Sequence, residues 1–116
     1  MRRGEIRLVD LEPVRGSGAR MRCPAVIVSN DGANAAAGAR GTGAITVIPL
    51  TTRVETVFAF QALVSAAVAG LPDDTKAHAE QVRSVSVERV GPKVGMIPAA
   101  DMHDIDRALR IQLGLV

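Results

Sequence analysis

Short apolar runs separated by turn residues dominate this chain and predict several strands. Residues 6–11 mix large or β-branched apolar side chains with polar ones, and residues 25–28 form a continuous apolar run typical of a buried strand. The same reasoning predicts strands or extended segments at residues 44–50, 57–64, 75–85 and 93–97. Clusters of Gly, Pro, Asn, Asp and Ser predict loops at residues 12–22, 29–32 and 70–74.

Helical patterns are confined to three places. Residues 33–39 predict a short helix and residues 87–90 a helical turn. The C-terminal helix is predicted with Pro98 at its first position, Asp101 in its first turn and Gly114 at its end. Its apolar stripe consists of Met102, Ile105, Leu109 and Leu113. We therefore predict a mainly β fold with α, in which a small curved sheet or barrel is closed by a C-terminal helix.

The length of 116 residues predicts a single domain over residues 1–116. No apolar run approaches the ~20 residues of a membrane span, and the N-terminus has no signal-peptide pattern, so we expect a cytoplasmic protein without membrane partners. The single cysteine, Cys23, excludes an internal disulfide framework and a cysteine-built zinc site.

Arginine accounts for twelve of the fourteen basic residues. Six of these arginines crowd the first 22 residues: Arg2, Arg3, Arg7, Arg15, Arg20 and Arg22. Arginine forks match phosphate geometry, which points to nucleic acid; a genome that favours arginine codons is the alternative. The only aromatic residues are Phe58 and Phe60, so stacking cannot be the main source of affinity for a single strand.

Candidate chemistry is sparse outside these arginines. Asp73 and Asp74 fit a solvated turn better than a metal site, and no other group has convincing metal-ligand spacing, so no metal or other cofactor is predicted. His78 and His103 could form an acid–base pair, but neither has an orienting carboxylate evident in the sequence. Cys23 precedes a proline and an apolar strand, which favours an inert thiol.

Arginine and hydroxyl groups remain as candidates for a phosphate site. If the strands at residues 25–28 and 44–50 pair antiparallel, Arg22 or Cys23 lies near Thr51 at one edge of the sheet. Arginine could then neutralise charge on a phosphodiester while threonine donates a hydrogen bond.

Five blocks of sequence resemble the MazF/PemK/Kid toxins. They are RGEIxLVDLxP (3–13) followed by GS (16–17), PAVIVSND (24–31) with Asn34, VIPLT (47–51), GLPDD (70–74) with EQVRSV (80–85), and VG (94–95) with residues 102–115. The resemblance implies an SH3-like barrel that forms a homodimer. It also implies sequence-specific, metal-independent cleavage of single-stranded RNA, held in check by a cognate antitoxin whose acidic disordered tail covers the RNA groove.

The same resemblance implies site residues. Thr51 takes the position of the catalytic threonine, whereas Cys23 stands where the family has its catalytic arginine. We therefore expect Arg22 or Arg20 to supply the missing charge. The expected RNA-binding residues are Arg15, Ser17, Arg20, Thr52, Arg53, Gln81 and Arg83. Two alternatives stay open: a non-catalytic relative that binds RNA or an antitoxin, and a toxin with a protein target such as a topoisomerase.

Overall fold

The computed structural model describes residues 1–11 and 22–115. Its strands are β1 (Glu5–Asp10), β2 (Arg22–Ile27), β3 (Ala44–Thr51), β4 (Gln61–Val64), β5 (Thr75–His78), β6 (Arg83–Ser86) and β7 (Val90–Met96). Its helices are α1 (Asp31–Arg40), α2 (Ala66–Ala69) and α3 (Met102–Leu113), with short 3-10 turns η1 (Ala79–Gln81) and η2 (Val87–Arg89). The mainly β architecture with a C-terminal helix is thus confirmed.

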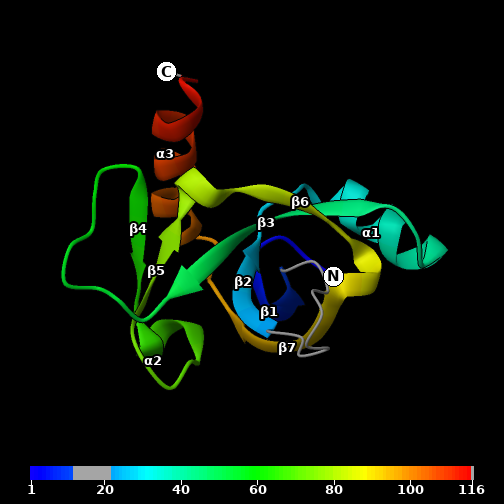
Figure 1. Cartoon of the computed structure of the whole chain (residues 1–116), viewed down its shortest axis with the longest axis horizontal. Helices are drawn as coiled ribbons and strands as arrows, with labels where there is room; N and C mark the ends of the chain where they lie inside the picture. Colours follow the sequence, from blue (N-terminus) through cyan, green and yellow to red (C-terminus); the bar gives the residue numbers. More distant parts are fainter. Residues whose placement is uncertain (12–21, 116) are drawn as a thin grey trace, which may run out of the picture.

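The strands form an antiparallel sheet in the order β4-β5-β3-β2-β1-β7, and β6 continues along the edge of β3 beyond β5. Figure 1 shows the chain from β6 to β7 curving around β1 and β2. Barrel closure requires hydrogen bonds between the two outermost strands. Within the described residues β7 pairs with β1 and β4 pairs with β5, so the sheet stays open and the predicted closed barrel is not confirmed.

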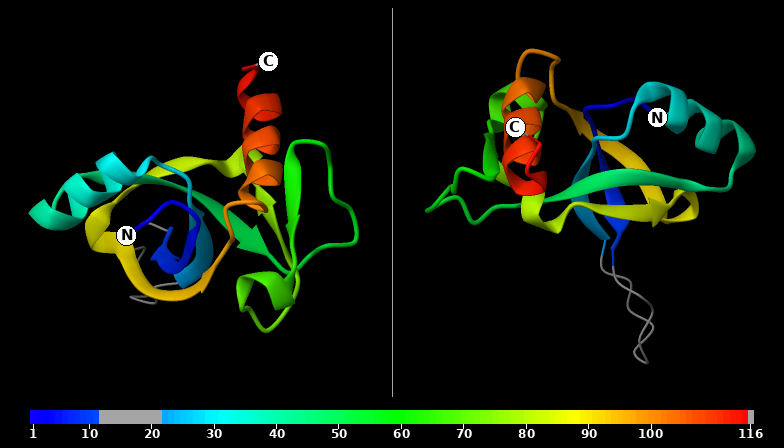
Figure 2. Two further views of the ribbon diagram at one scale, coloured as in Figure 1. Left: turned by 180° about the vertical axis from the view of Figure 1, so that it is seen from behind. Right: turned by 90° about the horizontal axis from the view of Figure 1, so that it is seen from above.

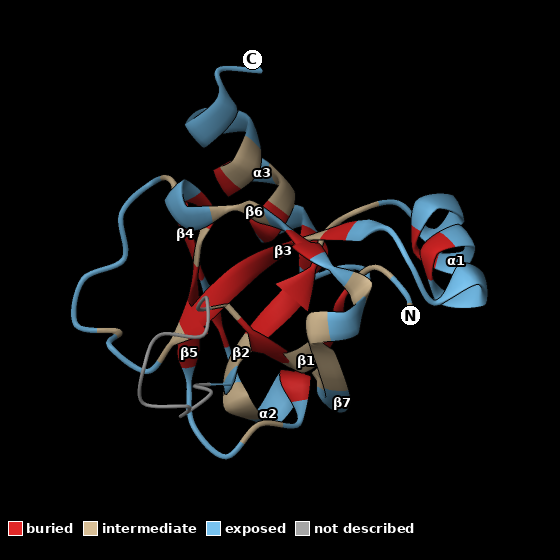
Figure 3. Cartoon of the chain, turned by 45° about the vertical axis from the view of Figure 1, so that its right-hand side comes forward, coloured by how far each residue is buried: buried red, intermediate tan, exposed pale blue. Residues whose placement is uncertain are grey.

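Side chains alternate between two faces of the sheet, and paired residues of antiparallel strands share a face. The α3 face is the side on which residues of the sheet pack with Met102 and Ile105 of α3; these residues are Ile6, Val26, Ile48, Ala62 and Ala77. The α1 face is the opposite side, where the core consists of Val9, Ala25, Ile27, Ala37, Ile45, Val47 and Val85. Figure 3 shows that β2 and β3, which contribute to both clusters, carry much of the buried surface.

The two longer helices lie at opposite ends of the molecule (Figures 1 and 2). The side chain of Asn30 caps α1 by accepting a hydrogen bond from the backbone of Ala33 at 2.8 Å. The helix then ends where Gly41 adopts a φ of 66°. None of the helices in the described part of the chain is long and apolar enough to cross a membrane.

Several elements differ from the prediction: β7 begins at Val90 rather than at residue 93, and α2 was not predicted. Strand β4 begins at Gln61 rather than at residue 57, because a local turn forms first. In this turn the backbone N–H of Phe58 donates to the side-chain oxygen of Gln61, and the backbone N–H of Gln61 donates to the carbonyl of Phe58. The extended segment 75–85 is interrupted by η1. Helix α3 begins at Met102, whereas Pro98 only accepts hydrogen bonds from the N–H groups of Asp101 and Met102 in a preceding turn.

Candidate functional site

Thr51 is the last residue of β3 and is half-buried. It follows Val47 and Pro49 at intervals of two residues along β3, so it lies on the same face as they do, the α1 face. Its hydroxyl oxygen accepts a hydrogen bond from the backbone N–H of Arg53 at 3.3 Å. The hydroxyl proton therefore remains available to a ligand, since a hydroxyl both donates and accepts.

Strand register pairs Lys76 with Thr51 and places Cys23 on the same face as both. Lys76 of β5 is the direct antiparallel partner of Thr51. Directly opposite residues have Cβ atoms about 4.5–5.5 Å apart. On the other edge of β3 the pairing with β2 ends at Ala25 and Pro49, two residues short of Cys23 and Thr51. The proximity of residue 23 to Thr51 therefore remains a prediction.

Arg22 lies on the other side of the sheet. It is paired with Asp10 and lies two residues before Pro24, so it is on the α3 face. Its guanidinium extends to β7, where one nitrogen lies 2.9 Å from the point that a Cβ on Gly91 would occupy. Cys23 therefore shares the face of Thr51 whereas Arg22 does not, and the catalytic role of Arg22 remains a prediction.

One expected RNA-binding residue, Arg83, lies further along the edge of β3 on the α1 face. Arg83 of β6 is paired with Val47, and its guanidinium donates at 3.4 Å both to the carbonyl of Leu11 and to that of Gln81. Gln81 itself is exposed in η1, and Arg53 is exposed just after β3. The predicted residues Arg15, Ser17 and Arg20 lie outside the described residues.

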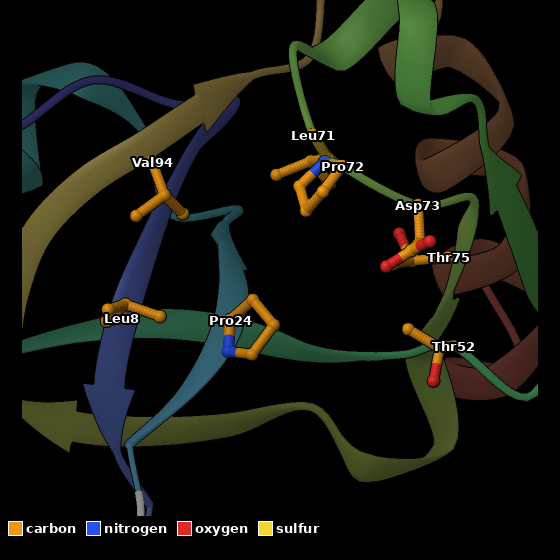
Figure 4. A pocket seen from close by; sticks show the side chains of 8 residues that line it. All are labelled: Leu8, Pro24, Thr52, Leu71, Pro72, Asp73, Thr75 and Val94. Atoms are coloured by element: carbon orange, nitrogen blue, oxygen red, sulfur yellow. The ribbon is translucent and has the colours of Figure 1, made fainter.

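Thr52 lines a groove of about 250 Å³ on the α3 face. Figure 4 shows Asp73 and Thr75 close together at one end of this groove, with the oxygen of Thr52 directed away from them. Its remaining lining is apolar: Leu8, Pro24, Leu71, Pro72 and Val94. Thr51 and Thr52 therefore lie on opposite faces of the sheet, and the expected contact of Thr52 with RNA remains a prediction.

Sequence reasoning missed the polar surroundings of Thr51 on β5. Lys76 is buried, and its ammonium donates to the carbonyl of Thr56 at 2.5 Å and lies 5.9 Å from the ring centre of Phe58. Phe58 stacks on Phe60 in the segment between β3 and β4, and Phe58 is 53% exposed. The sequence carried no signal for this cluster, because residues 51 and 76 meet only through strand pairing.

His78 also gains a partner that sequence reasoning missed. Its Nδ1 lies 3.5 Å from Glu80 Oε2, and the same oxygen accepts a hydrogen bond from Gln61 at 2.7 Å. His103 lies on α3, far along the chain, and is exposed. No group of three His, Cys, Asp or Glu side chains suited to a metal ion occurs among the described residues.

A second ionic cluster stabilises the strand pair that carries residue 23. Glu5 is 6% exposed and accepts hydrogen bonds from Arg7 at 2.8 and 3.0 Å. Burial alone would raise the pKa of Glu5, but the hydrogen bonds and charge of Arg7 hold this pKa below its ordinary value. Arg7 also donates to the carbonyl of Gly91, which ties β1 to β7.

Comparison with known proteins finds relatives that belong to one toxin family. A family model described as PemK-like, MazF-like toxin of type II toxin–antitoxin system matches residues 2–113. The chain is 50% identical over 115 residues to Endoribonuclease MazF9 of Mycobacterium tuberculosis (strain ATCC 25618 / H37Rv), a match that covers 99% of this chain and 98% of that protein.

Solved structures share the fold at lower sequence identity. An endoribonuclease in complex with its cognate antitoxin, from a mycobacterial species, superposes with a TM-score of 0.76 at 23% identity and covers 100% of this chain and 97% of that one. MazF (Form-I) from Deinococcus radiodurans has a TM-score of 0.72 at 22% identity, covering 98% and 96% of the two chains.

Proposed function

Because this chain belongs to the PemK-like, MazF-like toxin family of type II toxin–antitoxin systems, we propose that it cleaves single-stranded RNA on the α1 face around Thr51. The observation that carries this proposal is the strand register of Thr51, which pairs it with the cationic residue Lys76 on the face that also holds Arg83. A hydroxyl donor beside a cation can hold a phosphodiester and stabilise charge that develops on its oxygens.

The reaction is transesterification within the RNA. The 2′-oxygen attacks the adjacent phosphorus and loses its proton to water. The bond from phosphorus to the 5′-oxygen breaks, and that oxygen takes up a proton from water. The products are a 2′,3′-cyclic phosphate and a 5′-hydroxyl. Thr51 donates a hydrogen bond to a non-bridging phosphate oxygen, while Gln81 and Arg83 bind neighbouring nucleotides.

Several further properties belong to the same proposal. The protein acts as a homodimer in the cytoplasm, and its curved sheet is a variant of the SH3-like barrel. A cognate antitoxin with an acidic tail neutralises it. A basic RNA-binding surface offers this tail complementary charge. Arg15, Ser17, Arg20, Thr52 and Arg53 complete the proposed contacts to RNA.

The test is cleavage of a long single-stranded RNA in EDTA, with the new ends mapped. We expect cyclic-phosphate and 5′-hydroxyl ends at a short recurring sequence, and their loss in Thr51→Ala. Random ends, or equal cleavage by Thr51→Ala, would contradict the proposal.

Cys23 favours one alternative, a relative that binds RNA or antitoxin without cleaving. A neutral thiol with an ordinary pKa near ~8.5 does not replace a permanent charge. Binding of RNA by both the natural protein and Thr51→Ala, with no cleavage by either, would support this alternative.

A further inference from the structure

Lys76 carries a charge that the protein itself hardly compensates. The side chain is 8% exposed, so more than nine-tenths of its surface is removed from water. Its ammonium has the carbonyl of Thr56 as acceptor and the ring of Phe58 nearby. Among the residues that the structure describes, no carboxylate lies within ion-pair distance of this ammonium.

Such burial is unfavourable unless an anion is bound nearby. Lysine is almost never fully buried without a partner, because its ammonium loses hydration that one carbonyl does not restore. An ammonium has three N–H donors, and Thr56 accepts from one of them. The remaining donors and the uncompensated charge suit the oxygens of a phosphodiester.

The position of Lys76 identifies which phosphate this is. It is the register partner of Thr51, so the two side chains leave the same face of adjacent strands. Cys23, on the same face of the neighbouring strand β2, contributes no positive charge. We propose that Lys76 supplies the positive charge to the phosphodiester held at Thr51, in place of the arginine that the family resemblance places at position 23. This inference rests on the proposed function.

Neither of the other nearby cations fits this role as well. Arg83 is paired with Val47, four residues from Thr51 along β3, which is about 13 Å at 3.3 Å per residue. Arg22 lies on the α3 face and extends towards Gly91. Arg83 therefore suits a neighbouring phosphate, whereas Lys76 suits the phosphate that reacts.

The chain offers a matched control, because its only other lysine, Lys93, is exposed on β7 away from this cluster. We would measure kcat and KM for RNA cleavage by the natural protein, Lys76→Met, Lys76→Gln, Lys76→Arg, Lys93→Met and Thr51→Ala. Circular dichroism and thermal unfolding would be recorded for each. Removing the buried charge should leave the fold intact, since apolar replacement of buried charge is often neutral or stabilising.

We expect Lys76→Met and Lys76→Gln to lower kcat by about 100-fold with a much smaller change in KM, because the charge acts mainly in the transition state. Lys76→Arg should retain activity within about tenfold of the natural protein, and Lys93→Met should match it. A purely structural role would not give this dependence on charge.

Two results would overturn the inference while leaving the proposed function standing. One is cleavage by folded Lys76→Met or Lys76→Gln within about threefold of the natural protein, while Thr51→Ala is inactive. The other is a loss of kcat in Arg22→Ala that the Lys76 variants do not share. If the natural protein and Thr51→Ala are both inactive, the proposed function itself fails and this inference fails with it.

Discussion

Cys23→Arg is expected to raise RNA cleavage. The alternation of side chains along β2 and β3 places residue 23 on the α1 face, which Thr51 shares. Cys23 is only half-buried at the beginning of its strand, so a longer side chain can reach solvent without displacing the core. The substitution places a permanent charge where the natural protein has a thiol.

The expected gain in rate depends on the distance between the new charge and the phosphate held at Thr51. Adjacent strands are about 4.8 Å apart, and at that distance two unit charges interact by about 3.5 kcal/mol with an effective dielectric constant of about 20. At about 8 Å the interaction is about 2 kcal/mol, or about 30-fold in rate. Because residue 23 lies near solvent, we adopt the smaller value. The gain should be smaller while Lys76 is present, since both cations act on the same charge.

The assay is single-turnover cleavage of an end-labelled RNA in the natural and the Lys76→Met backgrounds. We expect about a 30-fold gain from Cys23→Arg in the Lys76→Met background and a smaller gain in the natural protein. Cys23→Gln, which adds length without charge, should fall well short of the arginine variant in both. The reasoning is refuted if Cys23→Arg raises cleavage in neither background while Thr51→Ala abolishes it.

Three other predictions test separate parts of the molecule. Phe58→Ala should weaken binding of single-stranded RNA by about 1–3 kcal/mol, because a base loses its stacking partner. The salt dependence of the affinity, measured by fluorescence anisotropy at several salt concentrations, should stay unchanged, because stacking releases no counterions. An affinity equal to that of the natural protein would contradict a stacking role. Since Arg7 lowers the pKa of Glu5 in the folded state, this pair should stabilise the protein above the ordinary pKa of glutamate, and the stability should be lost as pH falls through the lowered value. Thermal unfolding of Glu5→Gln should lack this acid-dependent part, and an unchanged pH profile would count against the pair. Asn34→Ala should cost about 1–3 kcal/mol in chemical denaturation, because fully buried Asn34 bonds both the carbonyl and the hydroxyl of Ser29; a loss below about 0.5 kcal/mol would show that water replaces those bonds.

Local sequence determined most of the elements of this fold. The apolar run at residues 25–28 lies mostly in β2, and the stripe of Met102 and Ile105 became the buried side of α3. These predictions succeeded because alternation and helical periodicity are properties of neighbouring residues. The predicted start of the fourth strand at residue 57 was wrong, because the side chain of Gln61 provided a local hydrogen bond that the apolar pattern does not reveal.

The candidate site was only partly accessible from sequence. Thr51 and Cys23 were recognised through the family resemblance, and their place on one face depends on the pairing of consecutive strands β2 and β3. Arg22 and Cys23 are neighbours in sequence, yet the pleat of β2 sends them to opposite faces. A shift of one residue in register would exchange the two.

Only the tertiary structure placed Lys76 beside Thr51. The two residues are separated by β4, α2 and two connecting segments, and they meet because β5 pairs with the end of β3. Phe58 then covers the ammonium from the intervening segment. The sequence determined which side chains could bind phosphate, because charge and hydroxyl chemistry belong to the residue itself. Their arrangement depended on long-range strand register, which is set by packing of the whole sheet and not by any local pattern.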